Sequence, residues 1–245
     1  MARVEFGETW VYESIVSALP GIDVSRRLAI AIQLGIFEVG VLLSAWYYDL
    51  WGAALAGTAA VFVAALGSVE MLRISSLVRS ESLPHTYRQL LFGSSIEVVL
   101  GVLAYVALIT QIFVFAPQRG GDSLLDTLIG PEPPVVVVYL ILLVLWDVCY
   151  RIGTAWWASV VALWRSVRYR FDPRTARALR RSDLEIVAFA TAQLVLYPFV
   201  ADQPVIQTVI LGHVAAVWGV SGLSAVLVTV RARDEAENRR ESAAR

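Results

Sequence analysis

The sequence predicts an all-α fold: a polytopic membrane protein built as a six-transmembrane-helix bundle with the N- and C-termini inside. The first observation is composition, since 58% of the 245 residues are hydrophobic and 17% are charged. Soluble domains average about 45–50% apolar and about 25% charged residues. The second observation is a set of six long apolar segments, and the third is the confinement of arginine to alternate connections between them.

Six segments have the length and apolar character of membrane-spanning helices, which need about 20 residues to cross the hydrocarbon core. We expect these helices at residues 28–48, 52–72, 90–115, 134–158 (with an extension to 164), 184–201 and 205–230. Backbone groups in lipid must be satisfied within the segment, which favours helices over strands. Pro198, near the end of the fifth segment, predicts a kink there.

The arginines predict the orientation of the bundle. All 20 basic residues are arginine, and one set of connections holds all of those outside the spans except Arg119. Because positive charge stays on the cytoplasmic side, both termini are expected in the cytoplasm, with the protein in the cell membrane. Residues 28–230 then form the transmembrane domain. Residues 1–27 form a cytoplasmic leader, either an interfacial helix or a flexible segment, and residues 231–245 form a charged cytoplasmic tail.

Small residues recur every four positions in the second and sixth segments. Such spacing lets helix backbones approach closely, which predicts that both helices lie in the bundle interior. The residues are Ala56, Ala60, Ala64 and Ser68 in the second segment, and the pairs Gly212 with Ala216 and Ala215 with Gly219 in the sixth.

Five ionisable residues lie deep within the apolar segments: Glu38, Glu97, Asp147, Arg151 and His213. A charge in lipid is costly and often marks an ion or proton pathway. Carboxylates outnumber the one arginine at this depth. We therefore expect a cation- or proton-conducting channel or transporter, with Glu38 and His213 near the midplane and Glu97 with the Asp147–Arg151 pair at the inner vestibule.

A different function is compatible with the same residues. Asp147 and Arg151 are one helical turn apart and can neutralise each other while holding two helices in register. The alternative is therefore a non-transporting membrane scaffold or a lipid-interacting protein. Seven arginines form a second candidate site, which either binds anionic lipid head groups or serves only to fix topology. They are Arg165, Arg168, Arg170, Arg174, Arg177, Arg180 and Arg181.

The sequence predicts neither catalysis nor a cofactor. The stretch "GVSG" at 219–222 is similar to the Gly-x-Ser-Gly of rhomboid intramembrane proteases, which are also six-helix proteins. However, His213 and Ser221 share one helix about 12 Å apart along its axis, too far for a nucleophile–base pair. Two histidines and the single Cys149 offer no zinc or haem ligand spacing. The expected partner is the bilayer, and a homo-oligomer is an open alternative. Nucleic acid is not expected.

Overall fold

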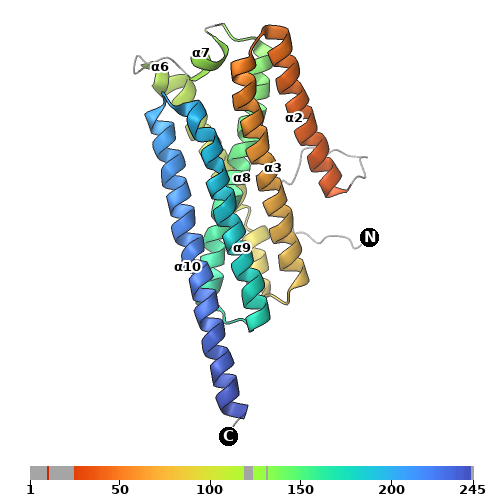
Figure 1. The fold of residues 1–245 in the computed structure, drawn as a ribbon, viewed down its shortest axis with the longest axis vertical. Helices are drawn as coiled ribbons and strands as arrows, with labels where there is room; N and C mark the ends of the chain where they lie inside the picture. Colours follow the sequence, from red (N-terminus) through yellow and green to blue (C-terminus); the bar gives the residue numbers. More distant parts are fainter. Residues whose placement is uncertain (1–9, 11–24, 119–123, 131, 244–245) are drawn as a thin grey trace.

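The structure is a computed structural model that describes residue 10 and residues 25–118, 124–130 and 132–243. All regular structure in these ranges is helical (Figure 1). The α-helices are α2 (Arg26–Tyr48), α3 (Trp51–Ser80), α4 (His85–Phe92), α5 (Ile96–Thr110), α6 (Ala116–Gln118), α7 (Leu124–Ile129), α8 (Val135–Arg168), α9 (Pro173–Ala192) and α10 (Pro204–Ala243). A π-helical segment, η1 (Gln111–Phe115), follows α5, and a 3-10 segment, η2 (Gln193–Val200), follows α9.

Six helical stretches within the described ranges are long and apolar enough to cross a membrane. They are Arg27–Tyr48, Trp51–Ser80, His85–Gln118, Val135–Arg168, Pro173–Val200 and Pro204–Glu235. The all-helical class and the expected number of helices able to span a membrane are thus confirmed for the described residues. The described spans extend beyond most of the boundaries predicted from hydropathy, and α3, α8 and α10 are the longest helices.

The long helices run side by side along one axis (Figure 1). α8 contacts α3, α5 and α10, α9 packs against α10, and α2 packs on α3. The α2–α3 turn, α6 and α7 lie at one end of the bundle, while the α8–α9 connection and the C-terminus lie at the other. We call the latter the arginine end, since it carries the exposed side chains of Arg168, Arg170 and Arg174.

Apolar side chains point outward from all the long helices, as expected of a protein surrounded by lipid. Examples at 50–64% exposure are Leu43 on α2, Phe62 on α3, Leu103 on α5, Leu184 on α9 and Val209 on α10. The aromatic residues Trp46, Tyr47 and Trp51 are also exposed at the α2–α3 turn. This surface suggests a bilayer environment for the six helices.

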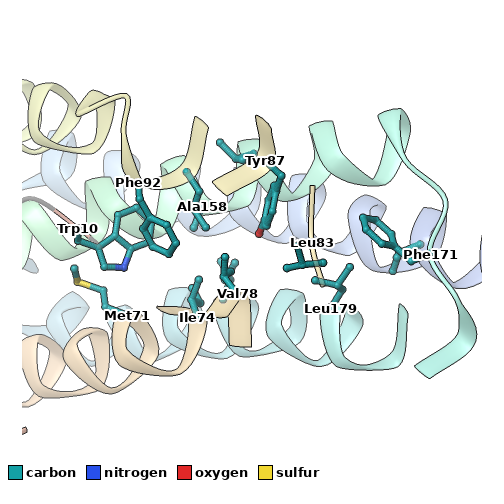
Figure 2. Packing of buried hydrophobic residues seen from close by; sticks show 14 of the residues in the cluster. Trp10, Met71, Ile74, Val78, Leu83, Tyr87, Phe92, Ala158, Phe171 and Leu179 are labelled. Atoms are coloured by element: carbon teal, nitrogen blue, oxygen red, sulfur yellow. The ribbon is translucent and has the colours of Figure 1, made fainter. Parts of the chain in front are cut away.

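The largest buried apolar cluster fills the half of the bundle nearer the arginine end. It joins residues of α3, α4, α8, α9 and α10, with Trp10 at one side (Figure 2). The Trp10 indole packs edge-on against Phe92, with ring centroids 4.8 Å apart, beside Met71. The expected leader at residues 1–27 otherwise lies outside the described residues, apart from its last three positions.

The third span is interrupted, which the sequence analysis did not predict. α4 ends at Phe92, and α5 begins at Ile96 after Ser95 adopts a left-handed conformation with φ 55°. The Ser94 hydroxyl donates to the Leu90 carbonyl over 2.8 Å and satisfies a backbone group at the break. α5 therefore starts anew, with Glu97 in its first turn.

The arginine-rich segment 165–181 is mostly helix, contrary to the expected inner loop. α8 continues to Arg168, and α9 begins at Pro173. The Asp172 side chain caps α9 by accepting hydrogen bonds from the backbone N–H groups of Arg174 (2.9 Å) and Thr175 (3.2 Å). Hydrogen bonding from Thr175 lowers the pKa of Asp172. Pro198, where a kink was expected, lies in the 3-10 segment.

The small-residue motifs of the two helices have different environments. Ala60, Ala64 and Ser68 of α3 are buried, as predicted. The prediction is wrong for α10, which packs on α8 and α9 through another face that includes Val214, Val217 and Ser221. The motif residues of α10 are exposed: Gly212, Ala215, Ala216 and Gly219. Four-residue spacing indicates a close-packing face but not whether a neighbour occupies it.

Candidate functional site

The Asp147–Arg151 pair lies inside the bundle at 0% and 1% exposure. Arg151 Nε donates to Asp147 Oδ2 and Nη2 donates to Oδ1, each over 2.9 Å. Gln33 of α2 donates to Oδ1 over 2.9 Å, and Arg151 Nη1 approaches the Met71 sulfur of α3 at 3.7 Å. These four side chains, which we call the upper cluster, join α2, α3 and α8.

A glycine on α3 makes room for the Arg151 side chain. A Cβ at Gly67 would lie 2.9 Å from the Arg151 Cβ and 2.8 Å from the Phe189 ring. At these distances the Phe189 ring and the Arg151 side chain would both have to shift. Gly67 therefore allows α3, α8 and α9 to meet beside the ion pair, which is fully enclosed by protein.

Glu97 is also fully buried, at 0% exposure, in the first turn of α5. One turn further along, Gly101 packs against α8 so closely that a Cβ on Gly153 would lie 2.8 Å from the Gly101 nitrogen. The interruption before Ile96 thus brings Glu97 to the α5–α8 contact. A carboxylate is favoured at a helix N-terminus by the helix dipole.

Glu38 and His213 contact residues outside the upper cluster. Glu38 is half-buried on α2, and its Oε1 accepts a hydrogen bond from Thr58 of α3 over 2.8 Å. The His213 ring on α10 faces Trp156 of α8, with centroids 6.1 Å apart. Glu38 Oε2 and His213 Nε2 have no hydrogen-bond partner among the described residues. The structure thus joins Asp147 directly to Arg151, whereas Glu38 and His213 contact other residues.

A second polar cluster lies toward the arginine end, and the sequence analysis missed it. Arg165 Nη2 donates to Asp183 Oδ1 over 2.6 Å and to the Leu179 carbonyl over 3.2 Å. Arg165 Nη1 donates to the Tyr87 hydroxyl over 3.2 Å. Ser224 donates to Asp183 Oδ2 over 2.7 Å and lies 2.9 Å from the Ser166 hydroxyl. This lower cluster joins α4, α8, α9 and α10.

The position of Arg165 does not fit its assignment to the lipid-binding candidates. Its side chain is 2% exposed, and Asp183 is fully buried. A signal for this was present in the spacing of α9, where Leu179, Asp183 and Ile186 recur every three or four residues on one buried face. The other six candidates are exposed: Arg168, Arg170, Arg174, Arg177, Arg180 and Arg181.

The hollows described on the surface lie away from both clusters. One, of about 300 Å³, is lined by Leu43, Ser44, Trp46, Tyr47 and Tyr48 of α2. The other, of about 310 Å³, is lined by Pro133, Val135, Val138, Tyr139 and Leu142. Neither is lined by a candidate site residue. Within the described ranges, no three side chains of His, Cys, Asp or Glu gather as metal ligands, and Cys149 is a free, buried thiol.

The fold, the apolar surface and the buried clusters together define an all-helical protein compatible with a multi-pass membrane protein. The chain belongs to a family of unknown function (DUF7530), whose model matches residues 5–224. No curated protein and no solved structure matches the chain significantly.

Proposed function

We propose that the chain is a multi-pass protein of the cell membrane, with cytoplasmic termini, that acts as a non-transporting, lipid-interacting scaffold. The observation that carries this proposal is the closure of the upper cluster. Both oxygens of Asp147 accept from Arg151, and Gln33 adds a third hydrogen bond. An ion pair that is fully occupied and shielded from solvent holds helices together and offers no open ligand to a passing cation.

The pairing of Asp147 with Arg151 removes one of the three deep carboxylates from a possible pathway. A pathway would then depend on Glu38 and Glu97. Glu38 accepts a hydrogen bond from Thr58 of α3, and the His213 ring faces Trp156 of α8. The contacts of Glu38 and His213 therefore do not link these two residues to each other or to the upper cluster.

The orientation is proposed from the distribution of charge. The exposed arginines Arg168, Arg170 and Arg174 lie at the end that also holds the C-terminus. At the opposite end, the exposed charged side chains of the described residues include Asp126 and Asp202. By the positive-inside rule, this supports a cytoplasmic arginine end.

The surroundings of Ser221 and His213 support a non-enzymatic role. Ser221 is buried on α10, and its hydroxyl has no partner among the described residues. His213 lies two turns away on that helix and faces Trp156. The serine therefore lacks the neighbouring base that a nucleophile requires.

A reconstitution experiment with a stability series tests the scaffold proposal. We expect parent protein in liposomes to give no Na⁺, K⁺ or proton flux above protein-free vesicles. Asp147→Asn should lower stability in detergent by about 3–5 kcal/mol, since it strands a buried guanidinium, and the double change Asp147→Leu with Arg151→Met should restore most of it. The control is Arg181→Gln, which removes an exposed pair of the same four-residue spacing and should cost at most about 1 kcal/mol. A cation flux in the parent that Asp147→Asn abolishes would refute the scaffold.

A second candidate, cation or proton conduction, is favoured by one observation: the interrupted third span. Transporters place substrate sites where a membrane helix breaks, at the ends of half-helices. Here the break precedes the buried Glu97. If this candidate is correct, Glu97→Gln and Glu38→Gln reduce a flux measurable in the parent, while Glu185→Gln, a change of the same type at the exposed pair, leaves it unchanged.

A further inference from the structure

We propose that the exposed arginines of residues 168–181 form a binding surface for the head groups of anionic phospholipids in the surrounding membrane. This inference rests on the proposed membrane placement and names the partner of the scaffold. We call this surface the arginine surface. It consists of Arg168, Arg170, Arg174, Arg177, Arg180 and Arg181.

The arginine surface is built on a helix face and its adjoining turn. Arg174, Arg177 and Arg181 recur at intervals of three and four residues, so they project from one side of α9. Arg168 ends α8, and Arg170 lies in the short connection that leads to α9. Guanidinium groups from two successive helices and their connection thus face solvent together.

Most acids near this surface have partners outside it, whereas Glu185 also pairs with Arg181 and offsets one of the six arginines. Asp183 is buried against Arg165, and Asp172 caps α9. Glu185 pairs with both Arg73 (2.6 Å) and Arg181 (3.1 Å), and Glu81 accepts a hydrogen bond from Thr175 over 3.1 Å. The six arginines outnumber the neighbouring exposed acids, so the surface carries a net positive charge that favours an anionic partner.

The height of this surface along the bundle favours lipid over a soluble polyanion. On α3, the rise from Trp51 at the aromatic turn to the exposed Arg73 is about 33 Å, close to the ~30 Å of a bilayer's hydrocarbon core. Arg73 and Arg181 both form an ion pair with Glu185, so they lie at the same height. Leu184, 52% exposed, lies one turn beyond Arg181 on the same side of α9. The arginine surface therefore begins where the apolar surface ends, at the level of lipid phosphates.

The lower cluster makes this surface rigid. Arg165 and Asp183 bind α8 to α9 over 2.6 Å, and Ser224 ties Asp183 to α10. Phe171 and Leu179 are buried beneath the arginines. Because the hairpin is held from inside, the arginines lose little further backbone freedom on binding. The guanidinium group presents a planar fork of donors that matches two oxygens of a phosphate, as lysine does not.

The test uses the full chain in nanodiscs of phosphatidylcholine with increasing phosphatidylglycerol, and it counts bound lipids by native mass spectrometry. Both leaflets have the same composition, so insertion orientation does not affect the result. We expect the parent to retain phosphatidylglycerol selectively. Arg170→Gln, Arg174→Gln and Arg177→Gln together should weaken that retention by on the order of tenfold or more. The same three positions changed to lysine should restore only part of it.

The matched control removes the same charge elsewhere, by Arg79→Gln, Arg88→Gln and Arg233→Gln, and should leave phosphatidylglycerol retention near that of the parent. Equal loss in both triple variants would overturn the arginine surface, as would a parent with no preference for phosphatidylglycerol. Tight binding of a duplex DNA probe through the same three arginines, without lipid selectivity, would also overturn it. Failure of the proposed membrane placement is seen separately, because the parent would then not enter nanodiscs at all.

Discussion

At the scale of single residues, the part of the bundle that the structure describes contains two buried arginine–carboxylate pairs, and only one was predictable. Asp147 and Arg151 are four residues apart on one helix, so their contact followed from spacing and is present in the structure. Arg165 and Asp183 belong to different helices, α8 and α9. Their pairing depends on how far α8 continues and how α9 is rotated, which the composition of the segment does not determine. A segment with seven arginines has the composition of a solvated loop, although the Arg165 side chain points into the bundle.

The lower cluster makes a prediction at this scale. Asp183→Ala should destabilise the protein by about 3–5 kcal/mol, because it leaves the buried Arg165 guanidinium without its counter-charge. The measurement is the midpoint of thermal unfolding in detergent. Arg168→Gln, an exposed change one turn from Arg165 on the same helix, should shift stability by no more than about 0.5 kcal/mol. Equal stability of Asp183→Ala and the parent would show that this ion pair contributes nothing net.

At the scale of elements, helix contacts depend on where small residues meet a neighbour. The repeated small residues were correctly predicted to face inward on α3 and wrongly on α10, because identical spacing arises on both kinds of face. The close backbone contact between Gly101 and Gly153 involves single glycines that are not part of a repeated motif. The break after Phe92 was equally hidden, since "FGSS" sits at the edge of an apolar run and its neighbours on both sides favour helix.

The α5–α8 crossing gives a prediction with an internal control. Gly153→Ala should cost about 1–3 kcal/mol, because the new Cβ meets the Gly101 backbone and cannot be relieved by turning a side chain. Gly212→Ala on α10 meets nothing within 4 Å and should be neutral or stabilise the helix by up to about 1 kcal/mol. Chemical denaturation in mixed micelles compares the two variants. If Gly153→Ala proves as harmless as Gly212→Ala, the close approach of α5 and α8 is incorrect.

The start of α9 predicts a pH dependence. Asp172→Ala should cost about 1 kcal/mol at neutral pH, since it removes the acceptor of two backbone N–H groups. The folded-state pKa of Asp172 is lowered, so its contribution is complete above the unfolded pKa of about 3.9 and is lost as pH falls through the lower folded pKa. The stability difference between parent and variant should stay constant from neutral pH to about pH 5 and shrink below about pH 4. A difference that grows on acidification would contradict this cap.

At the scale of the whole molecule, hydropathy was sufficient to predict six spans and the all-helical class. It could not predict how far the helices continue beyond the apolar segments. α8 runs to Arg168 and α9 starts at Pro173, so part of the bundle at the arginine end has its own buried apolar core outside the expected spans. The helical segments at the arginine end are amphipathic rather than uniformly apolar. A hydropathy window does not distinguish amphipathic helices from loops.

The opposed ends predict labelling from opposite sides of the membrane. Asp126→Cys and Arg174→Cys each place a thiol at an exposed position, at the two ends of the bundle. In intact cells, a membrane-impermeant maleimide should label Asp126→Cys, while Arg174→Cys should react only after permeabilisation. The parent chain provides the background. Reaction of both variants in intact cells, or of neither before permeabilisation, would contradict the proposed orientation.

Cys149 lies inside this bundle at 6% exposure, on the side of α8 opposite to Asp147 and Arg151, because two residues along an α-helix correspond to a rotation of about 200°. Packed there, its sulfur is sheltered from any reagent that cannot pass between the helices, and the chain has no second thiol. The rate at which a small alkylating agent reacts with the Cys149 thiol therefore measures how often α8 separates from its neighbours. The alkylation rate of the native Cys149 thus reports local opening of the bundle without an introduced label. A lipid that stabilises the protein should lower this rate.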